Sequence, residues 1–327
     1  MAVKNLIDGV REAMREEMAA DPRVVLLGED VGVRGGVFRA SEGLFGEFGE
    51  GRVIDAPLGE SGIAGVAIGM ALNGLRPIAE MQFADFMHPA FNQIVSEAAK
   101  IRYRSNNDFH VPMVIRAPFG GGVHGALYHS QSVEAFYMHV PGLKVVVPST
   151  PADAKGLLKS AIRDEDPVMY LEHKRTYRLV RGEIPDGDFT VPIGKARMVR
   201  EGKDVSIFAY GLMAIFAEQA AAELEKEGIS AEVVDLRTLL PLDREAILAS
   251  VAKTHRALIV YEANRTMGAG AEVAALIAEE ALYELDAPIR RLTGPDVPAM
   301  PFNTVQEENF MPNPEKIARA AREMLAS

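Results

Sequence analysis

The sequence predicts an α/β protein with two domains, each with mostly parallel strands flanked by helices. Short apolar runs alternate with helical stretches along most of the 327 residues. The alternation stops once, in a polar stretch rich in proline and glycine, and then starts again. We therefore predict a first domain over residues 1–178, a linker over 179–194 and a second domain over 195–327.

In the first domain, helical spacing of apolar residues or a helix-start signal marks the helices. Thr150 followed by Pro151 is such a signal, because threonine caps a helix and proline suits its first position. Glycines in the helix predicted from 61 to 74 would let another backbone pack closely. The predicted helices of this domain cover 6–18, 61–74, 89–103 and 151–163. The predicted strands cover 24–27, 53–54, 77–81, 112–117, 143–147 and 168–171.

The second domain repeats the alternation with fewer strands. Its predicted strands cover 205–209, 231–234 and 257–260. Its predicted helices cover 214–226, 243–251, 269–285 and 314–325. Strands that alternate with helices in this way favour parallel sheets.

Composition excludes several classes of function. The chain has 35 basic and 46 acidic residues, a net charge of −11, which argues against a nucleic-acid partner. It has no cysteine, so disulfides and thiolate chemistry are excluded. The N-terminus lacks the apolar core of a signal peptide, and the longest apolar run, 62–72, is shorter than the ~20 residues of a membrane span. We expect a cytoplasmic protein without a membrane partner.

Glu60 is the first candidate for a functional residue. It follows a predicted strand across a tight turn, so it should lie at the carboxyl edge of a sheet, where open α/β sheets bind ligands. On the pattern alone, the better interpretation is an acid that favours the start of a helix through its dipole. Ser61 lacks the G-x-S-x-G pattern of a nucleophile elbow, which excludes a serine hydrolase of that type.

A loop rich in glycine and histidine follows the strand at 112–117. His129 lies among polar neighbours there and is a candidate acid, base or anion stabiliser. The histidines of this region lack the paired helical spacing of zinc sites. Residues 120–125 match G-x-G-x-x-G, but no acid follows at about 20 residues, so we interpret the match as coincidence. The acids at 164–166 end a predicted helix, where a bound cation would offset their repulsion from the helix dipole.

These segments, in this order, resemble the β subunits of thiamine-diphosphate-dependent 2-oxo acid dehydrogenases over nearly the whole chain. The pyruvate, acetoin and branched-chain types share the matching motifs. The motifs are GED at 28–30, DAPLGESG at 55–62, GLRP at 74–77, QFADF at 82–86, YRS at 103–105, HSQ at 129–131, PGLKVV at 141–146, DAKGL at 153–157, DLRT at 235–238 and API at 287–289.

The resemblance implies a pyrimidine-binding domain followed by a transketolase C-terminal-like domain. It implies an α2β2 enzyme that decarboxylates a 2-oxo acid oxidatively and passes the acyl group to lipoyl groups of an acyltransferase core. The α subunit would hold Mg²⁺ and the diphosphate through a Gly-Asp-Gly…Asn motif. This chain has only DGD at 186–188, in the wrong order, so it would supply the pyrimidine half of a shared thiamine diphosphate site and be active only with an α subunit.

The resemblance also implies roles for individual residues. Glu60 would meet a ring nitrogen of the aminopyrimidine, and burial would raise its pKa above about 4.3, so that a proton stays available. His129 would face the reacting carbonyl and the lipoyl group. The pocket would be lined by Glu29, Leu58, Gly59, Gln82 and Phe86. A structural K⁺ would be bound by Met113, Ala161, Ile162, Asp164 and Asp166.

Other readings remain open on the sequence. The same two domain types occur in the C-terminal half of a split transketolase, although the HSQ and DAKGL motifs favour the dehydrogenase. A purely structural assembly protein would not need Glu60. The sequence leaves the 2-oxo acid undecided among pyruvate, branched-chain acids and the substrate of an acetoin dehydrogenase.

Overall fold

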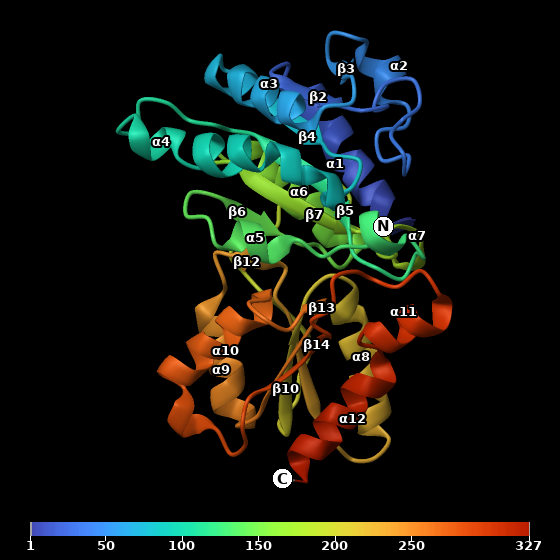
Figure 1. Ribbon diagram of the computed structural model, residues 1–327, viewed down its shortest axis with the longest axis vertical. Helices are drawn as coiled ribbons and strands as arrows, with labels where there is room; N and C mark the ends of the chain where they lie inside the picture. Colours follow the sequence, from blue (N-terminus) through green and yellow to red (C-terminus); the bar gives the residue numbers. More distant parts are fainter. Residues whose placement is uncertain (1, 327) are drawn as a thin grey trace. The chain divides into compact units, whose positions relative to one another are not determined.

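The computed structural model describes residues 2–326, and the chain folds into two compact units (Figure 1). The first runs to Phe119 and resumes over Phe136–Ile193. The second combines Gly120–Ala135 with the chain from Gly194 onward. The segment 120–135 therefore belongs to the second unit, although the chain reaches it in the middle of the first.

The first unit is built on a parallel sheet in the order β6-β7-β5-β4-β2-β3. These strands are β2 (Val24–Gly28), β3 (Val53–Asp55), β4 (Arg76–Glu80), β5 (Val114–Phe119), β6 (Lys144–Val146) and β7 (Val168–His173). Two short strands, β1 (Ala2–Asn5) and β8 (Arg181–Ile184), form a separate antiparallel pair. Strand β8 falls within the predicted linker.

The helices of the first unit pack an apolar core against this sheet. They are α1 (Leu6–Ala20), α2 (Leu44–Phe48), α3 (Glu60–Leu72), the 3₁₀ helix η1 (Ala84–Ala90), the π-helix η2 (Gln93–Ala98), α4 (Ile101–Arg104), α6 (Pro151–Arg163) and α7 (Thr176–Leu179). Helices α1 and α6 pack closely together, and their apolar sides join β2 and β4 in one buried cluster. The predicted start of α6 is confirmed, because the Thr150 hydroxyl accepts the Asp153 N–H at 3.1 Å and Pro151 is the first helical residue.

One expectation for this unit is wrong. The single helix expected over 89–103 is instead three short helical segments, η1, η2 and α4. Pro89 lies inside η1, where it has no N–H to donate to a preceding turn. Among residues 2–326, no atom lies within 4 Å of a Cβ added at Gly62, Gly65 or Gly69 of α3. The close approach of another backbone to these glycines therefore stays a prediction, which a second chain would have to fulfil.

The second unit contains a five-stranded sheet in the order β14-β13-β10-β11-β9, in which only β9 runs antiparallel. Its strands are β9 (Arg197–Arg200), β10 (Val205–Ala209), β11 (Ala231–Asp235), β13 (Ala257–Asn264) and β14 (Arg290–Gly294), and a short strand β12 spans Thr238–Leu240. Its helices are η3 (Ala126–Tyr128), α8 (Leu212–Glu225), α9 (Arg244–Thr254), α10 (Ala269–Glu280), η4 (Leu282–Glu284), α11 (Thr304–Phe310) and α12 (Pro314–Leu325), and α5 (Glu134–Met138) leads back to the first unit along the chain.

Helices α8 and α12 lie side by side and share a core with β10, β11 and β13 (Figure 1). The helix predicted over 269–285 ends at Glu280 and is followed by the 3₁₀ turn η4. Among residues 2–326, none of the helices combines the length and the apolar character needed to cross a bilayer. The two-domain α/β architecture with mostly parallel sheets is confirmed.

Candidate functional site

The carboxyl ends of β2, β3 and β4 form one edge of the first sheet, and the predicted cofactor residues gather there. Glu29 directly follows β2, Gln82 lies two residues after β4, and Glu60 begins α3 after β3. The Gly59 N–H donates to Glu29 Oε1 at 3.4 Å, and Gln82 Nε2 donates to Asp30 Oδ2 at 3.5 Å. Neighbouring parallel strands thus bring together residues that are 53 positions apart in the sequence, from 29 to 82.

At this edge the carboxylate of Glu60 lies close enough to Glu29 to affect the ionisation of Glu29. The pKa of Glu29 is raised, mainly by loss of water around it and next by the negative charge of Glu60, while the Gly59 N–H opposes the rise. Glu60 itself is half-buried, at the open first turn of α3. Two close carboxylates favour holding a proton between them and a bound group. This edge can therefore serve a ligand whose ring nitrogen shares a proton with an acid.

The helical segment η1 is fastened to the start of α3 beside this acid pair. Ser61 Oγ donates to the Pro89 carbonyl at 2.5 Å. Phe86, in η1, packs edge-on against Phe83 with ring centroids 5.4 Å apart. Phe86 is half-buried, whereas Leu58, also predicted to line the pocket, has a side chain 84% exposed. No group among residues 2–326 covers the apolar surface of Leu58.

His129 lies in the second unit, on the loop 120–135. The Gly120 N–H donates to the Gln131 carbonyl at 3.0 Å and closes the loop at its base. Gly125 lies against His129 so tightly that a Cβ there would come within 2.7 Å of the His129 Cβ. The His129 side chain is exposed. The loop thus presents its histidine outward from a closed base.

Two buried acids from the far end of the chain hold this loop in place. Glu262 Oε1 accepts the Gly121 N–H at 2.8 Å and the Ser132 hydroxyl at 2.9 Å. Glu307, 2% exposed, accepts the Gly122 N–H at 2.8 Å through Oε1. Its second oxygen lies 2.7 Å from His124 Nδ1.

The contacts of Glu262 and Glu307 also argue against a dinucleotide site at the G-x-G-x-x-G match, residues 120–125. The N–H groups of Gly121 and Gly122 would be the phosphate donors of a dinucleotide site. They already donate to carboxylates, which would also repel a phosphate. Nothing local in the sequence singles out these two acids, because the loop and its anchors are at least 130 residues apart.

The residues predicted to bind K⁺ do come together, at the C-terminus of α6. The Met113 carbonyl accepts the Val168 N–H at 3.0 Å, and the Ala161 carbonyl accepts the Asp164 N–H at 3.4 Å. Arg76 Nη1 donates to the carbonyls of both Ile162 and Asp164, at 3.0 Å each. Each of these carbonyls therefore already has a partner in the protein.

Side-chain cations neutralise the acids of the same region. Lys144 Nζ lies 2.6 Å from Asp164 Oδ2 and 3.5 Å from Asp166 Oδ2. Arg102 Nη1 lies 2.8 Å from Asp166 Oδ1. Over residues 2–326, no cluster of three or more histidine or acidic side chains has the arrangement of a metal site. Lys144 and Arg102 thus already supply positive charge to the two acids predicted to bind K⁺.

Comparison with known proteins places this geometry in a family. Residues 4–180 match the family described as "Transketolase, pyrimidine binding domain", and residues 194–317 match "Transketolase, C-terminal domain". The 2-oxoisovalerate dehydrogenase subunit beta of Bacillus subtilis is 61% identical over 99% of both chains. The chain belongs to the β subunits of 2-oxo acid dehydrogenases. The pyruvate dehydrogenase E1 component subunit beta of the same organism is 50% identical, again over 99% of both chains.

A solved structure with a similar fold carries a different name. It is described as "Split gene transketolase, inactive beta4 tetramer", with a TM-score of 0.80, 27% identity, and coverage of 98% of this chain and 97% of that chain. The fold therefore does not separate a dehydrogenase subunit from a split transketolase. Sequence identity does, because it is 61% with the dehydrogenase subunit. The split-transketolase alternative is not favoured.

Proposed function

We propose that this chain, together with an α subunit, decarboxylates branched-chain 2-oxo acids oxidatively, using thiamine diphosphate bound at the edge that carries Glu60. The observation that carries the proposal is the placement of Glu60 beside Glu29 at the carboxyl ends of β2 and β3. The 61% identity with a 2-oxoisovalerate dehydrogenase subunit, against 50% with a pyruvate dehydrogenase subunit, supports the branched-chain substrate.

The residues at this edge fit an aminopyrimidine ring. Glu60 offers a carboxylate at the open first turn of α3, and the half-buried Phe86 offers an apolar ring nearby in the same unit. When bound, thiamine diphosphate supplies the carbon nucleophile and the electron sink for decarboxylation. Glu60 holds or releases the proton of the pyrimidine ring nitrogen. The Glu29 carboxylate accepts the Gly59 N–H and so helps to hold the turn that carries Glu60.

Helix α3 supports the α partner. It is apolar almost all round, and helices of that kind are normally buried. Yet Gly62, Gly65 and Val66 are exposed in this chain, with Val66 at 52%. A partner that covers this face would also close over Glu60 at the start of the same helix. We assign Mg²⁺ and the diphosphate to that α subunit, and we do not include K⁺, because Lys144 and Arg102 neutralise the predicted site.

The test of Glu60 uses the chain co-expressed with its α partner. Glu60→Gln should leave the α2β2 assembly intact by gel filtration but lower decarboxylation by about 10² to 10³, as for other preorganised catalytic groups. Glu50→Gln, an exposed acid of the same unit, is the matched control and should keep full activity. Near-normal turnover by Glu60→Gln would refute the assignment of Glu60 as the acid that activates the cofactor.

His129 is assigned to acyl transfer onto the lipoyl groups of an acyltransferase core. His129→Ala should slow transfer to a lipoyl domain more than it slows decarboxylation measured with an artificial electron acceptor. His139→Ala serves as the control histidine. If both rates are unchanged in His129→Ala, this histidine takes no part in the reaction.

Three parts of the proposal have their own measurements. The substrate is decided by comparing kcat/KM for 2-oxoisovalerate and pyruvate, and a preference for pyruvate refutes the branched-chain assignment. The boundary at 179–194 predicts the first site of limited proteolysis in the native chain, and cleavage elsewhere argues against it. A cytoplasmic location predicts co-fractionation with the α subunit in cytosolic extracts, and recovery outside the cytosol contradicts it.

A further inference from the structure

The second unit contains a cavity of about 370 Å³ beside the edge strand β14 and helix α12. Part of its wall is apolar, formed by the half-buried residues Ile289 and Leu292. The charged residues that line it are Arg265, Arg290, Arg291, Lys316, Arg319 and Glu323. Five cations therefore share one cavity with a single acid, on a chain whose net charge is −11.

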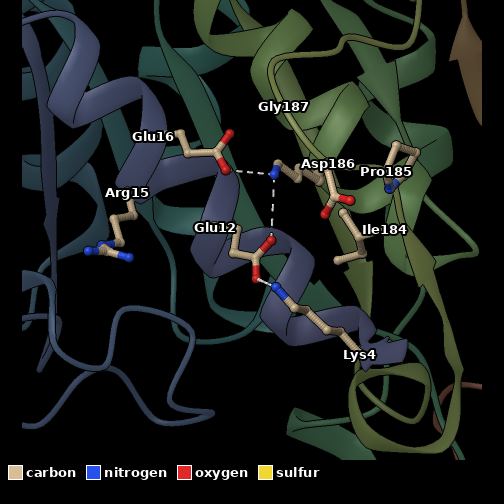
Figure 2. A pocket seen from close by; sticks show the side chains of 9 residues that line it. Lys4, Glu12, Arg15, Glu16, Ile184, Pro185, Asp186 and Gly187 are labelled. Carbon is tan, nitrogen blue, oxygen red and sulfur yellow. Dashed lines mark hydrogen bonds and ion pairs between the residues drawn. The ribbon is translucent and has the colours of Figure 1, made fainter. Parts of the chain in front are cut away.

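Most of these positive charges are not neutralised. Arg290 pairs with Glu323 at 2.6 Å. The other four cations make no ion pair within the part of the chain that the structure describes. A cavity of the first unit gives the contrast (Figure 2): there Lys155 Nζ lies 2.6 Å from Glu16 and 3.5 Å from Glu12. The first cavity is internally neutral, and the second is not.

The backbone holds two of these like charges side by side. Arg265 Nη1 donates to the Arg291 carbonyl at 3.1 Å, and Arg291 Nη1 donates to the Arg265 carbonyl at 2.8 Å. Arg291 Nη1 also donates to the Tyr261 hydroxyl at 3.3 Å. The pKa of Asp296 is lowered mainly by its hydrogen bonds from Thr266 and further by Arg265, so Asp296 offsets part of the Arg265 charge. Each guanidinium has further N–H groups free of these bonds.

Lys316 and Arg319 add charge from the first turns of α12. Lys316 Nζ donates to the carbonyls of Glu308, Asn309 and Met311, at 2.7 to 2.8 Å, so its position is fixed. Burial and the nearby charge of Arg319 lower the pKa of Lys316, in that order, and Glu315 opposes the shift. An anion in the cavity would favour the charged form of Lys316, against the effects of burial and of Arg319.

We propose that this cavity is a binding site for a small organic molecule carrying two or more phosphate charges. Guanidinium groups bind phosphate oxygens in pairs through their parallel N–H donors, and a fixed guanidinium loses little freedom on binding. One carboxylate would neutralise only one of the four unpaired cations, whereas a diphosphate matches most of them. The apolar wall accepts the uncharged part of such a molecule. None of the lining residues belongs to the set proposed to bind thiamine diphosphate.

The test titrates the full-length chain with inorganic pyrophosphate by calorimetry, with chloride held constant. We expect saturable binding. Arg319→Gln removes a charge that makes no polar contact in the described chain, so the fold should be kept, and affinity should fall about threefold to tenfold. Arg265→Gln with Arg291→Gln should abolish measurable binding. The matched control is Arg322→Gln, on the same helix, whose side chain pairs with Glu227 at 2.6 Å outside the cavity; it should bind as the wild type does.

Three outcomes overturn the proposal. One is an absence of saturable pyrophosphate binding in the wild type. Another is unchanged affinity in both the Arg319 variant and the double variant, which would place the anion elsewhere on the chain. The third is stronger binding of an acidic polyglutamate peptide than of pyrophosphate, which would make the cavity a surface for an acidic protein partner.

Discussion

Arg116 lies fully buried at the centre of the first sheet, and its replacement by methionine should be among the most damaging single changes in the protein. Its Nη1 donates to Glu80 Oε2 at 2.6 Å. Its Nε and Nη2 donate to both oxygens of Glu172, at 2.6 and 2.8 Å. The exposed fractions are 0% for Arg116 and Glu172 and 5% for Glu80. One guanidinium thus satisfies two acids on the neighbouring strands β4 and β7.

The size of the loss in folding stability follows from the hydrogen bonds that the two acids keep after Arg116→Met. Glu172 keeps the Tyr177 hydroxyl at 2.6 Å. Glu80 keeps no side-chain hydrogen bond among those found in residues 2–326. Breaking a buried pair costs about 3–5 kcal/mol, and two acids are affected here, so we expect about 5 kcal/mol. At about 2–4 °C per kcal/mol, Tm should fall by about 10–20 °C.

The loss should also depend on pH. The pKa of Glu80 is raised by burial even in the wild type, while Arg116 opposes the rise and the charge of Glu172 adds to it. Without Arg116 the folded-state pKa rises further above the unfolded value of about 4.3. An acid with a raised folded pKa loses stability as pH increases through that interval. Arg116→Met should therefore be less damaging at pH 5.5 than at pH 8.

Urea unfolding of the wild type and of Arg116→Met at pH 5.5 and at pH 8 measures the loss in folding stability and its pH dependence. Arg322→Met is the control, since an exposed pair such as Arg322–Glu227 contributes only about 0–1 kcal/mol. Adding Glu80→Gln to Arg116→Met should recover part of the loss, because it removes the unpaired charge. A loss below 1 kcal/mol, or one equal at both pH values and unrelieved by Glu80→Gln, would refute the reasoning.

Three further predictions concern other buried charges. Burial raises the pKa of Glu134 to about 7, although the hydrogen bond from the Tyr210 hydroxyl opposes the rise. The free energy of unfolding of the wild type therefore falls by on the order of 3 kcal/mol as pH rises from about 4.3 to 7. In urea unfolding, Glu134→Gln should be more stable than the wild type at pH 8 but not at pH 4.5, and an equal difference at both pH values would contradict this. Glu307→Gln weakens the pairing with His124 and should speed amide hydrogen exchange in the loop 120–131, while the amides of α9 stay protected. Unchanged exchange in the loop would show that Glu307 does not anchor the loop. Lys144→Met leaves Asp164 without the ammonium group that pairs with it. In the variant, but not in the wild type, Tm should therefore be higher in K⁺ than in Na⁺. A K⁺-specific rise of Tm in the wild type would show that the wild-type protein binds K⁺.

Much of the fold follows from local sequence. The cap formed by Thr150 and Pro151 defines the start of α6, and the motif around Glu60 lies at the predicted sheet edge. The region after residue 84 departs from prediction because Pro89 and a π-helical turn divide one apparent helical pattern into three segments. Short strands such as β8 and β14 were not predicted, since their residues lack a clear apolar period.

The sequence alone determined the α/β class, the family resemblance and the acid at the start of α3, because periodicity, helix caps and ordered motifs are properties of neighbouring residues. Tertiary structure alone decided which charges meet. The loop that carries His129 belongs to the second unit because its N–H groups donate to Glu262 and Glu307. Lys144 likewise pairs with Asp164 only in the folded chain. Such pairings join residues that are distant in the chain, and their energies depend on burial and distance, which no local pattern encodes.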